Sequence, residues 1–252
     1  MKVWFVGAGP GDPELLTVKA HRLLTQCRCC IWAGSLVNPA LLSLLPDQAT
    51  IYDSAGMTLD ETISVMCEYR DKGTDVVRLH TGEPSLFGAI GEQIARLEDL
   101  GINFEIIPGI SSFQASAAIA GIELTMPEVS QTVIITRAAG RTPVPSHQTL
   151  EHIAPLKATL CIFLSIDKID AIVDQLIPHY GETCPAVAIY HASWPDQKMV
   201  KGTLADLAKK VIDSGMKRTG MILVGHALGK SRTVSQLYDS HFTHGYRKGT
   251  VE

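Results

Sequence analysis

Apolar residues in the first half of the chain form short runs, separated by longer stretches in which apolar positions recur with helical spacing. The runs span four or five residues between glycine, proline or polar residues, which predicts β-strands. They lie at Val3–Val6, Cys29–Trp32, Thr50–Asp53, Val76–His80 and Asn103–Ile107. The intervening stretches predict helices at Leu15–Gln26, Asn38–Leu45, Thr58–Lys72, Ala89–Leu100 and Ser112–Ala120. This alternation favours a mainly parallel sheet that helices cover on both faces.

The second half of the chain has a different pattern of apolar and polar residues. It predicts strands at Val133–Thr136, Thr159–Leu164, Ala186–Tyr190 and Met221–Val224, and helices at Lys168–His179 and Leu204–Ser214. A polar, proline-rich stretch over 137–147 predicts a long loop. The change of texture near 121–127 predicts two α/β domains, residues 1–121 with a mainly parallel sheet and residues 122–252 with a mixed sheet. We expect an active-site groove between them.

Composition and charge exclude several classes of protein. The 252-residue chain is 46% hydrophobic and carries a formal net charge of −4, without the basic excess that nonspecific nucleic-acid binding favours. No apolar run approaches the length of about 18 residues that spans a membrane. The apolar stretch at the N-terminus is too short for a signal peptide. We therefore expect a soluble, cytoplasmic protein with no membrane and no nucleic-acid partner.

Three of the six cysteines, Cys27, Cys29 and Cys30, form the stretch CRCC. A metal site would need a C-x-x-C pair matched by further ligands, and the sequence near CRCC has neither a second pair nor a histidine cluster. Cys29 and Cys30 also fall in a predicted strand, where a small apolar residue packs well. We predict buried structural cysteines and no metal site.

Three glycine- and proline-bearing loops follow predicted strands of the first half. They read GAGPGDP (7–13), TGEPSLFG (81–88) and PGISS (108–112). The carboxyl ends of parallel strands meet at one edge of a sheet, and ligands of open α/β sheets bind there. The three loops therefore predict one shared binding site.

Two nucleotide-binding motifs fit this sequence poorly. A dinucleotide fingerprint needs G-x-G-x-x-G and an acidic residue about 20 positions later. Here Asp12 takes the place of the third glycine, and the second strand ends in Ala33-Gly34-Ser35. The stretch GHALGKS (225–231) has three residues between its glycines, where a phosphate-binding loop needs four. The incomplete dinucleotide fingerprint disfavours a hydride-transferring enzyme.

Together the three loops resemble those of the tetrapyrrole methylase family, which transfers methyl groups from S-adenosylmethionine. The likeness continues through IFLS (162–165), ASWPDQ (192–197), KGTLADLA (201–208) and TGMILVG (219–225). Further stretches resemble one branch of the family, namely AGSLVNP (33–39), MPEVSQTVIITRAAGRTPVP (126–145) and YDSHFTHGYRK (238–248). That branch methylates carbon 11 of precorrin-4, or of its cobalt-containing form, in cobalamin (vitamin B12) biosynthesis.

The resemblance implies a set of residues that contact S-adenosylmethionine. They are Pro10, Thr81, Gly82, Glu83, Leu86, Ser111, Ser112, Leu164, Ala188, Thr219 and Gly220. The family usually has Gly-Asp in the middle loop, and this chain has Gly82-Glu83, so the role of the side chain at 83 is open. The resemblance also implies a homodimer.

The chemistry of methyl transfer suggests the remaining site residues. The sulfonium donor is already activated, so the reaction needs positioning more than a metal or a nucleophile. Asp12 is the candidate catalytic residue, to orient substrate or take a proton, although an aspartate in such a turn also bonds its own backbone. The acceptor is rich in carboxylates, which favours basic side chains. Arg137 and Arg141 are the first candidates, with His80 and Lys168 as further ones.

Two other functions stay open at this point. A methylase of the same family could act on another ring position or another tetrapyrrole, for example uroporphyrinogen III. A carrier or scaffold would bind the macrocycle without binding the donor.

Overall fold

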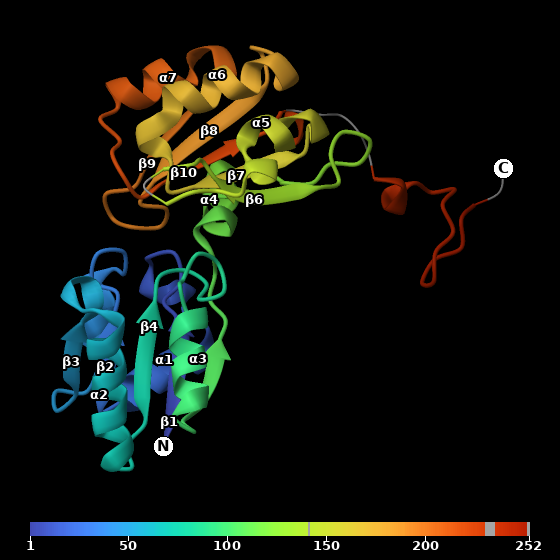
Figure 1. The fold of residues 1–252 in the computed structure, drawn as a ribbon. Coiled ribbons are helices and arrows are strands. Elements are labelled where there is room, and N and C mark those ends of the chain that lie inside the picture. Colours follow the sequence, from blue (N-terminus) through green and yellow to red (C-terminus); the bar gives the residue numbers. More distant parts are fainter. Residues whose placement is uncertain (141, 230–234, 251–252) are drawn as a thin grey trace. The chain divides into compact units, whose positions relative to one another are not determined.

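The computed structural model describes residues 1–140, 142–229 and 235–250, which form two compact units (Figure 1). Unit 1 comprises Met1–Ser116 together with the segment His191–Gln197, and unit 2 comprises the rest. The division between Ser116 and Ala117 lies inside helix α4 (Ser112–Ala120). The predicted boundary after Gly121 and the predicted groove stay predictions.

Unit 1 is built on a five-stranded sheet whose paired strands all run parallel. Its strands are β1 (Lys2–Gly7), β2 (Cys29–Trp32), β3 (Thr50–Asp53), β4 (Val76–His80) and β5 (Asn103–Ile107). They follow the order β3-β2-β4-β1-β5, so that β4 lies between β2 and β1. The predicted parallel sheet is confirmed.

Helices cover both faces of this sheet (Figure 1). Successive side chains of a strand point to opposite faces, so each strand supplies both cores. Val6 of β1 and Leu79 of β4 pack with α1 (Val18–Gln26) and the 3-10 helix Pro39–Leu44. Phe5 of β1 packs on the other face with α2 (Leu59–Asp71) and α3 (Gly91–Asp99).

Capping residues set where these helices begin. The helix predicted from Leu15 begins at Val18, because Thr17 caps it by accepting a hydrogen bond from the Ala20 N–H. A separate 3-10 turn, Pro13–Leu15, precedes it. The capping box predicted at Thr58 and Glu61 is confirmed, because each side chain accepts a hydrogen bond from the other residue's backbone N–H.

Unit 2 contains a mixed five-stranded sheet in the order β6-β7-β10-β8-β9. Its strands are β6 (Val133–Arg137), β7 (Thr159–Phe163), β8 (Pro185–Tyr190), β9 (Lys198–Thr203) and β10 (Gly220–Val224). The pair β6–β7 is parallel and the other pairs are antiparallel, which confirms the mixed sheet. The sequence did not predict β9, whose six residues are all half-buried or exposed.

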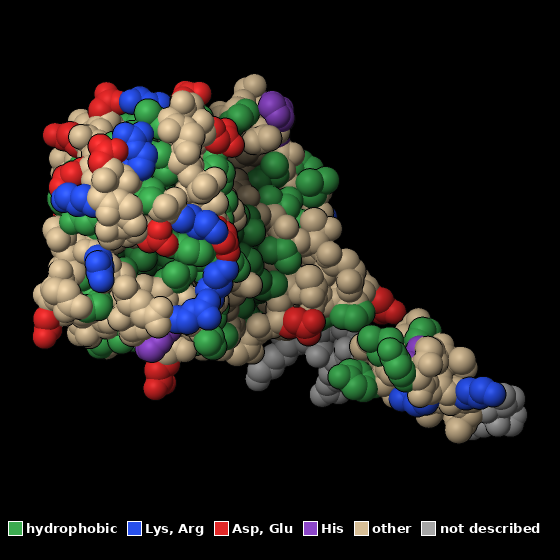
Figure 2. Space-filling view, turned by 90° about the horizontal axis from the view of Figure 1, so that it is seen from below, with side chains coloured by type: hydrophobic (Ala, Val, Ile, Leu, Met, Phe, Trp, Pro, Cys, Tyr) green, Lys and Arg blue, Asp and Glu red, His purple; other side chains and the backbone are tan. Residues whose placement is uncertain are grey.

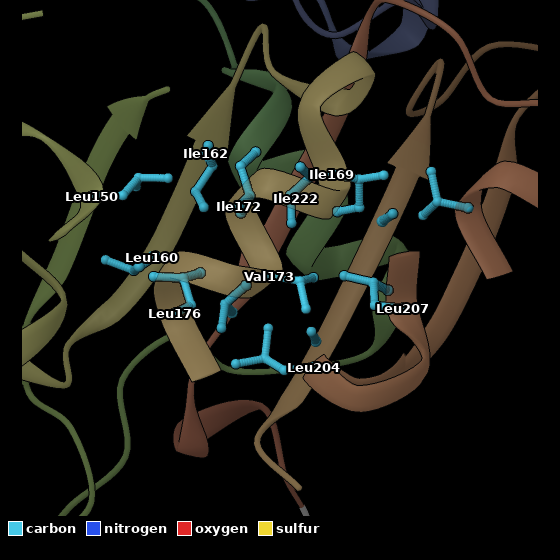
Figure 3. Packing of buried hydrophobic residues seen from close by; sticks show 14 of the residues in the cluster. Leu150, Leu160, Ile162, Ile169, Ile172, Val173, Leu176, Leu204, Leu207 and Ile222 are labelled. Carbon is cyan, nitrogen blue, oxygen red and sulfur yellow. The ribbon is translucent and has the colours of Figure 1, made fainter. Parts of the chain in front are cut away.

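The core of unit 2 lies between this sheet and its helices (Figure 3). Leu160 and Ile162 of β7 and Ile222 of β10 contribute from the sheet. The helices are α5 (Leu150–Ile153), α6 (Ile169–Tyr180) and α7 (Leu204–Asp213). They pack their apolar stripes onto one face, which fixes the strand ends that carry the predicted site residues of this unit.

The predicted burial of the CRCC cysteines is confirmed. Cys27 is 7% exposed, and Cys29 and Cys30 are 0% exposed. Burial raises the pKa of the Cys27 thiol to about 11 and that of Cys29 to about 12, so both are protonated at neutral pH.

The described part of the chain ends in a segment with little regular structure, 235–250, which contains one 3-10 turn (Gln236–Tyr238). Hydrophobic side chains lie on its surface, among them Leu237, Tyr238 and Tyr246 (Figure 2). Among the helices of the described residues, none is long and apolar enough to cross a membrane.

Candidate functional site

The three glycine-bearing loops of unit 1 leave neighbouring strands at the carboxyl edge of the sheet. β1 lies between β4 and β5, so the loops that follow these strands emerge side by side. The chain leaves β1 toward α1 on one face and β4 toward α3 on the other (Figure 1). Ligands of open α/β sheets bind at such a reversal. The three loops therefore lie together within unit 1, and the shared binding site that they predict stays a prediction.

Backbone groups join the loops directly. The Gly82 N–H donates to the Gly9 carbonyl at 2.9 Å, and the Gly9 N–H donates to the Gly82 carbonyl at 3.3 Å. A Cβ at Gly7 would lie 2.6 Å from Gly109 Cα, and a Cβ at Gly109 would overlap the Gly82 carbonyl oxygen. Glycine is therefore required at 7 and 109 because the three backbones touch.

Glu83 fastens the middle loop to the third loop. Its Oε1 accepts a hydrogen bond from the Ser85 N–H at 2.9 Å, and its Oε2 accepts one from the Gly109 N–H at 2.9 Å. Partial burial raises the pKa of the Glu83 carboxyl, but hydrogen bonds from Ser85 and Gly109 outweigh it and leave the pKa below its ordinary value. The longer arm of glutamate thus makes a defined bridge between two loops.

Of the residues of unit 1 that are predicted to contact the methyl donor, Gly82, Ser111 and Ser112 lie close together. A Cβ at Gly82, whose φ is +57°, would lie 3.7 Å from Ser111 Cα and 3.8 Å from the Ser112 nitrogen, so the two loops lie about one side-chain atom apart. Ser112 is the first residue of α4. Thr81, Glu83 and Leu86 are partly exposed, whereas Ser111 is 3% exposed.

The chemical groups of these loops suit the binding of a sulfonium cation with an amino-acid tail. The residues that meet here offer glycine backbone, serine hydroxyls and the Glu83 carboxylate, and none of them is a cation. A carboxylate and backbone carbonyls favour a positive charge nearby, and a helix N-terminus favours the carboxylate of an amino-acid tail.

The opening loop is held by a distant segment of the chain, residues 191–197, which belongs to unit 1. The Trp194 indole N–H donates to the Pro10 carbonyl at 2.9 Å, and the Asp12 N–H donates to Ser193 Oγ at 3.0 Å. The Asn38 side-chain amide donates to the Gly11 carbonyl at 2.8 Å. Sequence reasoning assigned no role to Ser193, Trp194 or Asn38, although ASWPDQ was among the family-like stretches.

Trp194 is itself supported within this segment. The His191 ring stacks on it with centroids 4.5 Å apart, and His191 Nδ1 lies 2.9 Å from a carboxylate oxygen of Asp196. His191 and Ser193 have positive φ values of 48° and 69°. Backbone in this region costs about 1–3 kcal/mol per residue and persists only where surrounding contacts fix it.

Asp12 takes the local role that the sequence left open. Its Oδ1 accepts a hydrogen bond from the Glu14 N–H at 2.9 Å, which caps the 3-10 turn Pro13–Leu15. Oδ2 takes no part in that bond. A role of Asp12 in orienting substrate or taking a proton stays a prediction.

The predicted donor residues of unit 2 lie at the ends and in the middle of its strands. Leu164 follows β7 with a φ of +52° and is 54% exposed, and Thr219 precedes β10 with a φ of +47°. A Cβ at Gly220 would lie 2.9 Å from Ile166 Cγ1, so the segment after β7 packs on the start of β10. Ala188 lies in the core and is 0% exposed. Their roles stay predictions.

The candidate substrate-binding cations differ in their surroundings. The Arg137 guanidinium donates to the carbonyls of Thr142 at 3.0 Å and Pro143 at 2.6 Å. Lys168 Nζ donates to the Ala139 carbonyl, on the same long loop. Arg141 lies outside the described residues.

His80 does not fit the predicted role of binding a substrate carboxylate. It is 4% exposed, and burial together with the nearby Arg78 lowers its pKa to about 3. Its ring is therefore neutral at neutral pH and offers no positive charge to a carboxylate. The sequence placed His80 at the carboxyl end of a strand but could not show that its side chain points inward.

The chain is similar to known proteins in sequence. The family model described as Tetrapyrrole (Corrin/Porphyrin) Methylases matches residues 2–208. The chain is 51% identical to the cobalt-precorrin-4 C(11)-methyltransferase of Methanocaldococcus jannaschii over 98% of this chain and 96% of that protein. It is 47% identical to the precorrin-4 C(11)-methyltransferase of Pseudomonas aeruginosa over 99% of this chain and 100% of that protein.

Solved structures resemble the fold as well. The X-ray structure of a cobalt precorrin-4 methyltransferase matches with a TM-score of 0.89 at 42% identity, over 91% of this chain and 96% of that chain. The uroporphyrin-III C-methyl transferase of Thermus thermophilus, complexed with S-adenosylhomocysteine, matches with a TM-score of 0.74 at 25% identity. That alignment covers 90% of this chain and 93% of that chain.

Proposed function

Since the chain belongs to the family of tetrapyrrole (corrin/porphyrin) methylases, we propose that it methylates carbon 11 of precorrin-4 or cobalt-precorrin-4 in cobalamin biosynthesis. The observation that carries this proposal is identity of 51% and 47%, over nearly the full length, to two proteins with that activity in their names. One of the two names contains cobalt and the other does not. The proposal therefore covers both forms of the ring.

We propose S-adenosylmethionine as the methyl donor, which supplies an activated methyl group on sulfur. Gly82 and Ser111 belong to two loops that lie close together, and Glu83 joins these loops through its hydrogen bond from the Gly109 N–H. These residues, with Thr81, Leu86 and Ser112, bind and orient the donor. Rigid loops suit this task because an in-line transfer depends on the alignment of the reacting atoms.

Five further residues are proposed contacts of the methyl donor. In unit 1, Pro10 contacts the donor through its ring, because its carbonyl already accepts the Trp194 N–H. In unit 2, the proposed contacts are Leu164, Ala188, Thr219 and Gly220. The exposed apolar side chain of Leu164 suits a flat adenine ring.

For the acceptor we propose Asp12, Arg137 and Arg141. The first bond of Asp12, to the Glu14 N–H, fixes the direction of its carboxylate. Arg137 donates to two carbonyls of the loop that follows it, which holds the guanidinium in place, and its remaining N–H groups would bind a carboxylate of the acceptor. A homodimer, as the family resemblance implies, and a location in the cytoplasm, as the lengths of the apolar runs predict, stay predictions that light scattering and cell fractionation would test.

The reaction itself gives the decisive experiment. The purified protein is incubated with S-adenosylmethionine and, separately, with precorrin-4, cobalt-precorrin-4 and uroporphyrinogen III, and the products are analysed by mass spectrometry and NMR. We expect one added methyl group at carbon 11 of a precorrin-4 form and none without donor. Methylation of uroporphyrinogen III alone would reassign the acceptor.

A carrier that binds only the macrocycle is the competing class of function. Calorimetry with S-adenosylhomocysteine separates the two. We expect binding with a Kd in the micromolar range, which corresponds to about −8 kcal/mol. Macrocycle binding without any donor-analogue binding would favour the carrier.

A further inference from the structure

Arg78, in the middle of β4, is a buried cation without a carboxylate partner. The residue is 7% exposed, and no ion pair with an Asp or Glu is found for it among the described residues. Burial lowers the pKa of its guanidinium to about 10, which still leaves it charged at neutral pH. A buried charge is costly unless its surroundings compensate it, so its contacts call for a reason.

Its contacts are carbonyl oxygens and one side-chain amide. Nη1 donates to the Ile31 carbonyl of β2 at 3.3 Å and lies 3.5 Å from the Leu79 carbonyl. Nε donates to Oε1 of Gln93, on α3, at 3.1 Å. The guanidinium thus joins β4, the neighbouring strand β2 and the helix that follows the middle loop.

Gln93 connects Arg78 to the middle loop. Its Nε2 donates to the Ala89 carbonyl at 3.2 Å. Arginine only donates hydrogen bonds, so the amide of Gln93 must turn its oxygen toward Arg78 and its NH2 group toward Ala89. Arg78 therefore sets the orientation of Gln93, and Gln93 in turn holds the carbonyl at the end of loop 81–89.

The end of that loop needs such support. Phe87 and Ala89 have positive φ values of 55° and 48°, which residues with side chains rarely adopt. Glu83 fixes the start of the loop through Ser85 and Gly109, and Gln93 contacts its other end. A role for Arg78 in packing alone would not explain a charged group, because an apolar side chain would fill the space at a lower cost.

We propose that Arg78 is a positioning residue that, through Gln93, holds loop 81–89 in the strained conformation that binds the methyl donor. The role of Arg78 in binding the methyl donor rests on the proposed function. Its role in holding loop 81–89 rests only on contacts within this chain.

The variant Gln93→Glu tests the relay without removing the partner of Arg78. A glutamate at 93 keeps an acceptor for Nε and adds the missing opposite charge, but its carboxylate faces the Ala89 carbonyl without a proton to donate. We expect a thermal midpoint equal to or above that of the wild type. Backbone amides of 85–89 should exchange hydrogen about three- to tenfold faster, as the loss of one hydrogen bond implies, and Kd for S-adenosylhomocysteine should rise by a similar factor.

Two further variants complete the experiment. Arg78→Lys keeps the charge but lacks the planar group that reaches Gln93 and Ile31 together, so we expect the same loosening of the loop. The double variant should be no looser than either single one if both act through one relay. Glu92→Gln, on an exposed residue of α3, is the matched control and should leave exchange and affinity unchanged.

Unchanged amide exchange of 85–89 in both single variants would overturn the inference, and additive effects in the double variant would show two separate roles and overturn the relay. Exchange is measured without ligand, so it does not depend on the proposed function. If the wild type failed to bind S-adenosylhomocysteine while the loop loosened as expected, the relay would stand and the donor assignment would fall.

Discussion

Single residues decide how the loops of unit 1 are joined, and Glu83 is the plainest case. Its two carboxylate oxygens each accept one backbone N–H, from Ser85 and from Gly109. The sequence showed only a departure from the usual aspartate. It could not show which backbone groups the longer side chain would reach, because Gly109 is brought close by the sheet and not by the chain.

We expect Glu83→Gln to lower the free energy of unfolding by about 1–3 kcal/mol. A glutamine has one oxygen, so its NH2 group must face one of the two backbone N–H donors and leave it without an acceptor. Urea unfolding at pH 7 measures the change, and Kd for S-adenosylhomocysteine should rise. Glu98→Gln, on an exposed residue, is the control. Equal stability of the two variants would mean that the bridge contributes little.

His80 predicts a dependence of stability on pH. Its folded-state pKa is about 3, because the ring is buried and lies near Arg78, whereas an unfolded histidine has a pKa of about 6.5. Below pH 6.5 the unfolded state binds a proton that the folded state does not bind. The contribution of His80 to the free energy of unfolding is therefore fully present above pH 6.5. It is lost as pH falls toward 3, by up to about 1.4 kcal/mol per pH unit.

The comparison of wild type with His80→Gln isolates this effect. We expect urea unfolding at pH 7.5, 6.5 and 5.5 to show a steeper loss of stability in the wild type than in the variant. Absolute stability also changes when a buried ring is replaced, so the slope is the quantity that matters. Parallel curves for the two proteins would show that His80 gains a proton in the folded state as readily as in the unfolded one.

At the scale of elements, the sequence predicted strands better than helix starts. The three central strands of unit 1, β1, β2 and β4, are short and mostly buried apolar runs, and such runs are recognised directly from the sequence. The start of α1 at Val18 depends on the cap at Thr17 and on the turn that Pro13 begins. Strand β9 (Lys198–Thr203) contains two lysines and lies at the edge of its sheet, so it lacks the apolar signal of a central strand.

The segment 191–197 is the element that sequence reasoning could not place. It follows β8 and precedes β9, both strands of unit 2, and yet its contacts are with the opening loop of unit 1. No local pattern encodes a contact between residues that lie so far apart in the chain. The position of Trp194 in turn depends on the opening loop, because Gly11 has a φ of +152° and a Cβ there would overlap the Trp194 ring.

We therefore expect Gly11→Ala to displace Trp194 and break its hydrogen bond to the Pro10 carbonyl. The free energy of unfolding should fall by about 1–3 kcal/mol, since the new methyl group also occupies a backbone conformation that favours glycine. Tryptophan fluorescence should shift as the indole becomes more exposed. Gly56→Ala is the control, because a Cβ there meets nothing within 4 Å. Equal spectra and stabilities for the two variants would refute the role of this contact.

At the scale of the whole molecule, the fold class and the family followed from the sequence, because the alternation of strands and helices and the three loops extend over much of the chain. The individual site residues followed less completely. Gly82 lies close to residues 111–112 because parallel strands end at one edge, which a sequence can predict. Ala188 is fully buried within its sheet, which strand periodicity alone did not reveal.

The proposed donor residues are divided between the two units, and this division gives a prediction for the whole chain. S-adenosylhomocysteine at about 100 times its Kd stabilises the bound protein by about 2.7 kcal/mol. Amides that become exposed only when the ligand leaves should then exchange up to about 100-fold more slowly. We expect this slowing at 81–88 and 109–112 in unit 1 and at 164–166 and 219–221 in unit 2. The exposed segment 235–250 should exchange at the same rate with and without ligand. Slowing confined to unit 1 would remove Leu164, Ala188, Thr219 and Gly220 from the donor site, while slowing confined to unit 2 would contradict the role of the three loops.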